Sequence, residues 1–104
     1  MNAGKMDAIK KAVWDVGVRG MTVTDVKGFG YEKTAVLGRR VEYSVELTPR
    51  IQVDVVVPDE AAEGVVEAMQ KAAWTGRIGD GKIFVLPVDD AVRVRTGERG
   101  EPAV

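Results

Sequence analysis

Residues 41–57, VEYSVELTPRIQVDVVV, carry the clearest secondary-structure signal in this chain. Apolar residues fill every second position in two runs, Val41, Tyr43, Val45 and Leu47 before Thr48-Pro49 and Ile51, Val53, Val55 and Val57 after it. A period of two residues is typical of strands with one buried face. Two such runs across a short polar break predict an antiparallel hairpin.

Helical periodicity flanks this hairpin on both sides. Residues 5–17 place Met6, Ile9, Val13 and Val16 on one face, and Gly17 is a plausible stop. A second helix begins at Pro58-Asp59, with Asp59 as a candidate N-cap. Its apolar face consists of Ala62, Val65, Val66, Met69 and Ala73.

The remaining segments predict further strands and loops. Residues 21–27 read as a strand that Gly28-Phe29-Gly30 ends, and residues 31–40 read as a long exposed loop. Residues 82–88 read as a strand, residues 91–95 as a shorter extended piece, and the tail from Thr96 as frayed. This order fits an α+β, ferredoxin-like split βαβ sandwich (βαββαβ), in a single domain spanning 1–104, with the N-terminal strand apparently missing.

Composition argues for binding rather than catalysis. The chain has 15 Lys and Arg against 16 Asp and Glu, a balance that predicts no direct binding to nucleic acid. Cysteine and histidine are absent and Ser44 is the only serine, which excludes thiolate chemistry and a Ser-His-Asp triad. No apolar run is long enough for a membrane span and no signal peptide opens the chain, so we expect a cytoplasmic protein.

The sharpest local motif is TGRIGDGK, residues 75–82. Gly76 and the pair Gly81-Lys82 have the spacing of a P-loop, but Ile83 replaces the Ser or Thr that binds magnesium. The order helix, loop, strand is also the reverse of a P-loop's, so an NTPase is not expected. The glycines and Lys82 still suit a phosphate, although a glycine-rich connection with an exposed lysine explains the motif equally well.

Other residues have two readings each. On a strand, Arg93 and Arg95 would share one face, with Val94 pointing into the core. Two arginines in this arrangement could bind a polyphosphate, or they could simply protect a solvated edge strand by their charge. Arg50 would join the same site if the sheet brings the strand ends together. Tyr43 fits inward packing by its alternation. Trp14 and Trp74 fit the core or a subunit contact better than ligand stacking.

In combination, four segments resemble the nitrogen regulatory P-II signal-transduction family over roughly residues 5–100. They are residues 20–30 (GMTVTDVKGFG), Glu42-Tyr43, residues 75–85 (TGRIGDGKIFV) and residues 92–98 (VRVRTGE). The ending RVRTGERG and the stretch EYSV look most like actinobacterial members. The resemblance implies a ferredoxin-like homotrimer that is a regulator rather than an enzyme and that binds ATP or ADP in clefts between subunits.

The resemblance also implies three loops. Residues 30–47 would form the T-loop, which docks on an ammonium transporter or on nitrogen-assimilation and modifying enzymes, so that any membrane contact would be peripheral, through the transporter. Residues 75–82 would form the B-loop around the phosphates, and residues 93–104 the C-terminal loop region. Family members also sense 2-oxoglutarate together with Mg²⁺ and ATP.

Matched position by position, the implied nucleotide-binding residues are Gly28, Phe29, Gly30, Arg50, Gly79, Asp80, Gly81, Lys82, Arg93 and Arg95. Arg50 stands where the family usually has lysine. Tyr43 matches the T-loop tyrosine that is uridylylated in many bacteria and adenylylated in the actinobacterial type, which favours modification over packing.

Three departures from the family pattern affect the function. Glu32 replaces the glutamine that helps to hold magnesium and 2-oxoglutarate; it can still bind Mg²⁺, but its charge repels a dianion. The T-loop aligns about one residue short, with unusual residues from Thr34 to Gly38. The first strand is missing, which would expose unpaired edges; either the chain starts late or the fold is completed by another route.

Three hypotheses follow. The first is a P-II signalling protein whose loop responds to ATP against ADP. The second is a diverged adenylate sensor that does not respond to 2-oxoglutarate because of Glu32. The third is a small nucleotide hydrolase built on residues 75–82, which lacks the Ser or Thr for magnesium.

Overall fold

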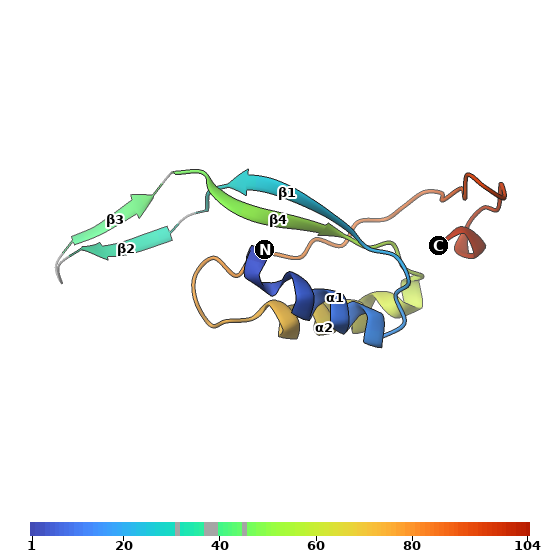
Figure 1. Cartoon of the computed structure of the whole chain (residues 1–104), viewed down its shortest axis with the longest axis horizontal. Helices are drawn as coiled ribbons and strands as arrows, with labels where there is room; N and C mark the ends of the chain where they lie inside the picture. The colour runs from blue at the N-terminus through green and yellow to red at the C-terminus, as the bar shows by residue number, and fades with distance from the viewer. Residues whose placement is uncertain (31, 37–39, 45) are drawn as a thin grey trace.

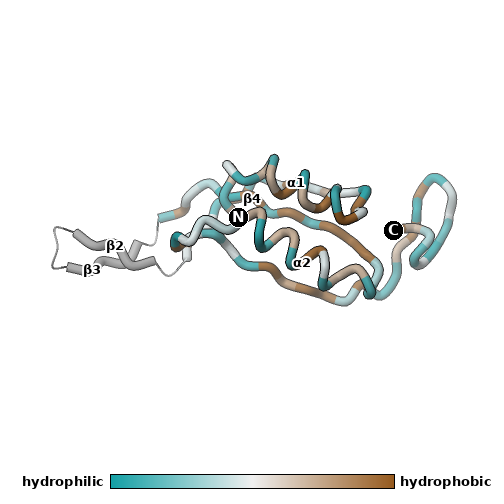
Figure 2. The backbone as a smooth tube through the Cα atoms, turned by 90° about the horizontal axis from the view of Figure 1, so that it is seen from below, coloured by the Kyte–Doolittle hydropathy of each residue, from teal (hydrophilic) through white to brown (hydrophobic). Residues whose placement is uncertain are grey.

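The fold is a two-stranded antiparallel sheet with two helices packed side by side against one of its faces (Figures 1 and 2). The structure, a computed structural model, describes residues 1–30, 32–36, 40–44 and 46–104. For 32–36 and 40–44 it describes the backbone only. Elements of both types in one layered unit make this an α+β protein, as the periodicities predict.

The main sheet pairs β1 (Thr22–Gly28) with β4 (Thr48–Asp54), so that Val23 lies opposite Val53 and Val26 opposite Arg50. β2 (Glu32–Val36) and β3 (Arg40–Ser44) form a separate antiparallel pair. The prediction of a hairpin between the two halves of residues 41–57 is therefore wrong, because β1 takes the partner edge of β4.

The prediction of a loop over residues 31–40 is also wrong in part, because β3 pairs with a segment other than β4. β3 needs a partner of its own, and residues 32–36 supply it, with Lys33 opposite Tyr43. Residues 31 and 37–39 lie outside the described residues. Residues 32–36 do not alternate between apolar and polar side chains. The β2–β3 pair is separate from the main sheet, so its strands can pair without a buried apolar face.

α1 (Met6–Asp15) follows a short 3-10 turn (Ala3–Lys5) and ends two residues before Gly17, which is the predicted stop. Gly17 has a φ of +99°, and its N–H bonds the Trp14 carbonyl at 3.0 Å. The next N–H, of Val18, reaches back to the Val13 carbonyl at 3.0 Å, which completes a Schellman motif. Because Val18 and Val13 are both buried, the motif also anchors the helix end in the core.

α2 (Asp59–Ala73) begins one residue after Pro58, which is its N-cap. The prediction that Asp59 caps the helix is wrong: Asp59 is the first helical residue, and with Glu60 it complements the positive end of the helix dipole. The buried residues of the two-helix core are Ile9, Val13, Val18, Val65, Met69 and Ala73. Of the face predicted for the first helix, Met6 and Val16 are instead exposed.

The C-terminal third contains no regular strand in the described residues. The predicted strand over 82–88 is extended but unpaired, and Phe84, Val85 and Leu86 are exposed. The tail is not frayed: Val92 forms a bridge with Arg99, and a 3-10 turn (Glu101–Ala103) follows.

One residue, Met1, pairs with the edge of β4 that β1 leaves open. Met1 exchanges two backbone hydrogen bonds with Ile51 of β4, at 2.7 and 2.9 Å, on the edge opposite β1. A reciprocal pair of this kind is the repeat unit of an antiparallel ladder. Beyond it, no strand of the described residues pairs with this edge.

The helices of the described residues include none that is both long and apolar enough to cross a membrane.

Candidate functional site

One pocket gathers most of the residues that the sequence singles out. Its volume is about 500 Å³, and it lies where the end of β1, the strand β4 and the turn after α2 meet. The predicted site residues that line it are Gly28, Phe29, Gly30, Arg50, Gly79, Gly81 and Lys82. The antiparallel register explains part of this, since it places Gly28 opposite Thr48, two residues before Arg50.

The glycine-rich turn has a backbone that side chains would distort. Gly79 and Gly81 have φ values of +100° and +108°, in the left-handed region that favours glycine. A Cβ added to Gly81 would lie 3.2 Å from the Cα of Met1. The turn therefore packs backbone against backbone on one side, and it presents the main chain of Gly79 and Gly81 to the pocket.

Asp80 turns its carboxylate back on the turn. It accepts hydrogen bonds from the Thr75 N–H at 2.6 Å, from the Gly76 N–H at 3.1 Å and from the Thr75 hydroxyl. These bonds, first of all the one from the Thr75 side chain, lower the pKa of the Asp80 carboxyl below its ordinary value. The geometry thus makes Asp80 a residue that shapes the turn; its direct contact with a nucleotide stays a prediction.

Neutralising Asp80 is expected to loosen this turn. In Asp80→Asn the charge-assisted bonds are lost, and we expect the Thr75 and Gly76 amides to exchange with solvent about tenfold faster. Because the folded pKa is lowered, the stabilisation is present above the ordinary carboxyl pKa, about 3.9, and is lost as pH falls through the folded value. The amide shifts of Thr75 and Gly76 should therefore titrate below about pH 4.

Hydrogen exchange and NMR titration measure both effects. Asp25→Asn, on the exposed part of β1, is the matched control and should leave the turn unchanged. Unaltered exchange at Thr75 and Gly76 in Asp80→Asn would contradict the role given to Asp80.

The pocket is lined by cations and by no carboxylate of the described residues. Lys82 and Arg50 line it together with Met1, which carries the terminal ammonium. Burial and, next, the positive charge of Arg50 lower the pKa of the Met1 amino group. An anion is the ligand that such a group of like charges attracts, and the glycine backbone of the turn adds N–H donors.

Arg93 and Arg95 are not brought to this pocket. The expectation that they share a strand face is wrong, because residues 93–97 form a turn in which the Gly97 N–H bonds the Arg93 carbonyl at 2.7 Å. The Arg93 guanidinium donates to the Pro102 carbonyl at 3.2 Å. Val94, expected in the core, is 97% exposed.

Tyr43 and Glu32 lie on β3 and β2, and their side chains lie outside the described residues. Neither the packing nor the modification of Tyr43 is therefore tested. Among the described residues, no group of three or more metal-binding side chains is present.

The two tryptophans are not core residues. Trp14 is 57% exposed, with the Arg19 guanidinium 3.9 Å from its ring centroid, and Trp74 is 66% exposed. Their exposure excludes the core position, so a subunit contact is the favoured interpretation that remains for both tryptophans.

The pocket also contains three residues that the sequence motifs do not identify, Met1, Ile78 and Phe84. The sequence predicts a strand position for Phe84 and no separate role for Ile78, which lies among the glycines. Met1 carries no signal of its own, because its position depends on the pairing with Ile51.

The fold and the pocket together define a small α+β protein with a glycine-rich turn beside the end of a two-stranded sheet. The profile of the nitrogen regulatory protein P-II family matches residues 1–98. Nitrogen regulatory protein P-II of Rhizobium meliloti is 52% identical over 101 residues, and that of Azospirillum brasilense is 50% identical; each match covers 96% of this chain and 90% of the relative.

Solved structures agree. Arabidopsis thaliana PII bound to citrate superposes with a TM-score of 0.82 at 39% identity, over 99% of this chain and 84% of that one. B. subtilis GlnK superposes with a TM-score of 0.82 at 30% identity, over 99% of this chain and 91% of that one. Both support the P-II form of the ferredoxin-like α+β fold.

The chain belongs to the nitrogen regulatory protein P-II family. It is therefore a regulatory signalling protein and not an enzyme, which sets aside the hydrolase hypothesis.

Proposed function

We propose that this protein senses adenine nucleotides, with the phosphates of ATP or ADP held in the pocket between β1, β4 and residues 75–82. The observation that carries the proposal is the pair of cationic side chains that line the pocket, Arg50 and Lys82, next to the main chain of Gly79 and Gly81. A phosphate chain offers several anionic oxygens, which match separate positive groups and backbone N–H donors.

The remaining elements complete the proposed sensor. Residues 30–47 serve as the T-loop that docks on targets of nitrogen metabolism, residues 75–82 as the B-loop, and residues 93–104 as the C-terminal loop region. Arg93 and Arg95 do not line the pocket within one chain, so their contribution requires a neighbouring subunit. A homotrimer would supply one, and it would also cover exposed apolar side chains such as Trp14 and Trp74.

A second effector is part of the proposal. Arabidopsis thaliana PII has been solved bound to citrate, a carboxylate ligand, which supports a small-molecule effector in this family. In this chain, 2-oxoglutarate would bind with Mg²⁺ and ATP, and Glu32 would be a magnesium ligand.

The charge of Glu32 favours a second candidate function, an adenylate sensor without a 2-oxoglutarate response. A carboxylate beside a dianionic effector costs binding energy unless the metal compensates.

Calorimetry tests both candidates. The proposed sensor binds ATP and ADP at one class of site, and ATP binding tightens when 2-oxoglutarate and Mg²⁺ are present. ATP binding that ignores 2-oxoglutarate, and that gains the response in Glu32→Gln, would assign the second candidate. If neither ATP nor ADP binds, both are refuted.

A further inference from the structure

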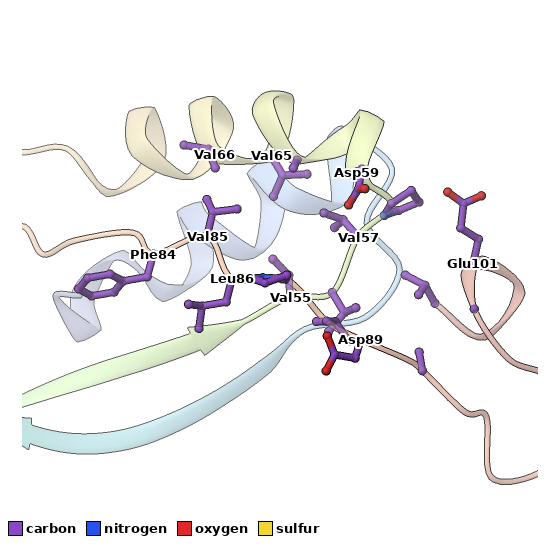
Figure 3. Close-up of a pocket in the computed structure, with 18 of the residues that line it drawn as sticks. Val55, Val57, Asp59, Val65, Val66, Phe84, Val85, Leu86, Asp89 and Glu101 are labelled. Carbon is purple, nitrogen blue, oxygen red and sulfur yellow. The ribbon is translucent and has the colours of Figure 1, made fainter.

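Trp74 is a large apolar side chain at the surface, next to the end of α2, and it is 66% exposed. It does not line the candidate nucleotide pocket. Nor does it line the apolar pocket of about 300 Å³ between the end of β4, α2 and residues 83–91, where Val65 and Val66 lie above Val85 (Figure 3). What the indole does contact is the glycine-rich turn that follows it, at Gly76.

The backbone of Trp74 is fixed by the end of α2. Trp74 is the C-cap of this helix, and its N–H bonds the Gln70 carbonyl at 3.1 Å. Its ψ of 131° is extended, so the helix stops here and the chain curves back toward the sheet (Figure 1). The indole is therefore attached to a helix end that the core holds in place through Met69 and Ala73.

The indole covers one face of Gly76. A Cβ added to Gly76 would lie 3.0 Å from Cζ2 and 3.3 Å from Cη2 of Trp74. Both atoms belong to the six-membered ring, so this ring occupies the space in which a side chain at residue 76 would stand. Gly76 also has a φ of +80°, in the left-handed region. The turn therefore needs glycine at this position for two separate reasons.

Asp80 holds Gly76 from a second direction. The Gly76 N–H donates to its carboxylate at 3.1 Å, beside the bond from the preceding N–H at 2.6 Å. Asp80 lies between Gly79 and Gly81, which line the candidate nucleotide pocket. Trp74, Gly76 and Asp80 thus form a continuous set of contacts from the end of α2 to the pocket.

We propose that Trp74 is a positioning residue for the glycine-rich turn: its indole packs on Gly76 and so holds residues 76–81 in the shape that presents the main chain of Gly79 and Gly81 to an anion. This assignment rests on the proposed function, in which the anion is the phosphate chain of ATP or ADP. Trp74 stays outside the pocket and acts through the turn. A turn already held in its binding shape needs no ordering when the ligand arrives, and this raises its affinity.

Truncating the indole tests the assignment in the full chain. In Trp74→Ala we expect the amides of Thr75 and Gly76 to lose about tenfold in protection from hydrogen exchange, and ATP to bind about 3- to 10-fold more weakly. Trp74→Phe should give intermediate values, because its smaller ring covers Gly76 only in part. Trp14→Ala removes the other exposed tryptophan and is the matched control; it should leave the protection of both amides unchanged.

A double-mutant cycle tests the contact itself. In the wild-type background, Gly76→Ala meets both the indole and the unfavourable φ, whereas in the Trp74→Ala background it meets only the unfavourable φ. The loss of protection at Thr75 caused by Gly76→Ala should therefore be at least about threefold larger when Trp74 is present. Additive effects of the two substitutions, or unchanged protection in Trp74→Ala, would overturn the proposal.

The two measurements separate this inference from the proposed function. If the wild type binds no ATP, the proposed function fails, while the protection of Thr75 and Gly76 in the nucleotide-free chain still decides whether Trp74 holds the turn. If the wild type binds ATP and Trp74→Ala binds it equally well, the positioning role is refuted. A loss of protection that disappears at high protein concentration would also refute it, because the indole would then act through a subunit contact.

Discussion

Replacing Ile9 by alanine is expected to lower the free energy of unfolding by about 2–5 kcal/mol. Ile9 is fully buried, at 0% exposure, and it belongs to the cluster in which α1 packs on α2. Removing its three terminal carbons leaves a cavity that Val13, Val65 and Met69 cannot close without moving two helices. In a domain of 104 residues this loss is a large fraction of the total stability.

Urea unfolding at one protomer concentration measures this loss. Val94→Ala provides the control, because Val94 is 97% exposed and its truncation should change stability by no more than about 0.5 kcal/mol. If Ile9→Ala and Val94→Ala were equally stable, the core would not lie between the two helices.

Replacing Lys82 by alanine is expected to weaken ATP binding about 10- to 100-fold. Lys82 lines the proposed nucleotide pocket beside Gly81, where its ammonium can bond a phosphate oxygen. A hydrogen bond to a charged group contributes about 1.5–3 kcal/mol, and each 1.4 kcal/mol is a factor of ten in affinity. The difference between wild type and variant should shrink as salt is added, because the lost term is electrostatic.

Calorimetry at two salt concentrations measures this effect. Lys71→Ala is the matched control: Lys71 is an exposed lysine in the last turn of α2 that does not line the pocket. Equal ATP affinity in Lys82→Ala and Lys71→Ala would remove Lys82 from the site.

The helices could be predicted from the sequence because each signals its own core face and end. The apolar period identifies Ile9, Val65 and Met69, and Gly17 terminates α1 through a left-handed φ that glycine favours. These signals are local, so they do not depend on which strand pairs with which.

Strand pairing could not be predicted in the same way. The alternation over residues 41–57 correctly marks extended backbone, yet it does not specify a partner, and β4 pairs with β1 instead of β3. Residues 82–88 have the composition of a strand, but they pair with no strand in the part of the chain that the structure describes. A strand is completed by a neighbour's backbone, which the segment's own sequence does not contain.

The candidate site was predicted in part. Glycines and cations identified by motif, such as Gly81, Lys82 and Arg50, do meet in one pocket. Asp80 is held by Thr75 within the turn, and Met1 enters the pocket through its pairing with Ile51. Both features arise from three-dimensional contacts that residue spacing alone does not encode.

The proposed ATP site lies where residues 28–30, Arg50 and residues 78–82 meet. Hydrogen exchange of the wild-type chain with and without ATP tests it most directly. We expect slower exchange at Gly30, Gly79, Gly81 and Lys82, with no change at the exposed face of α1. Protection confined to other segments, or none at saturating ATP, would contradict it.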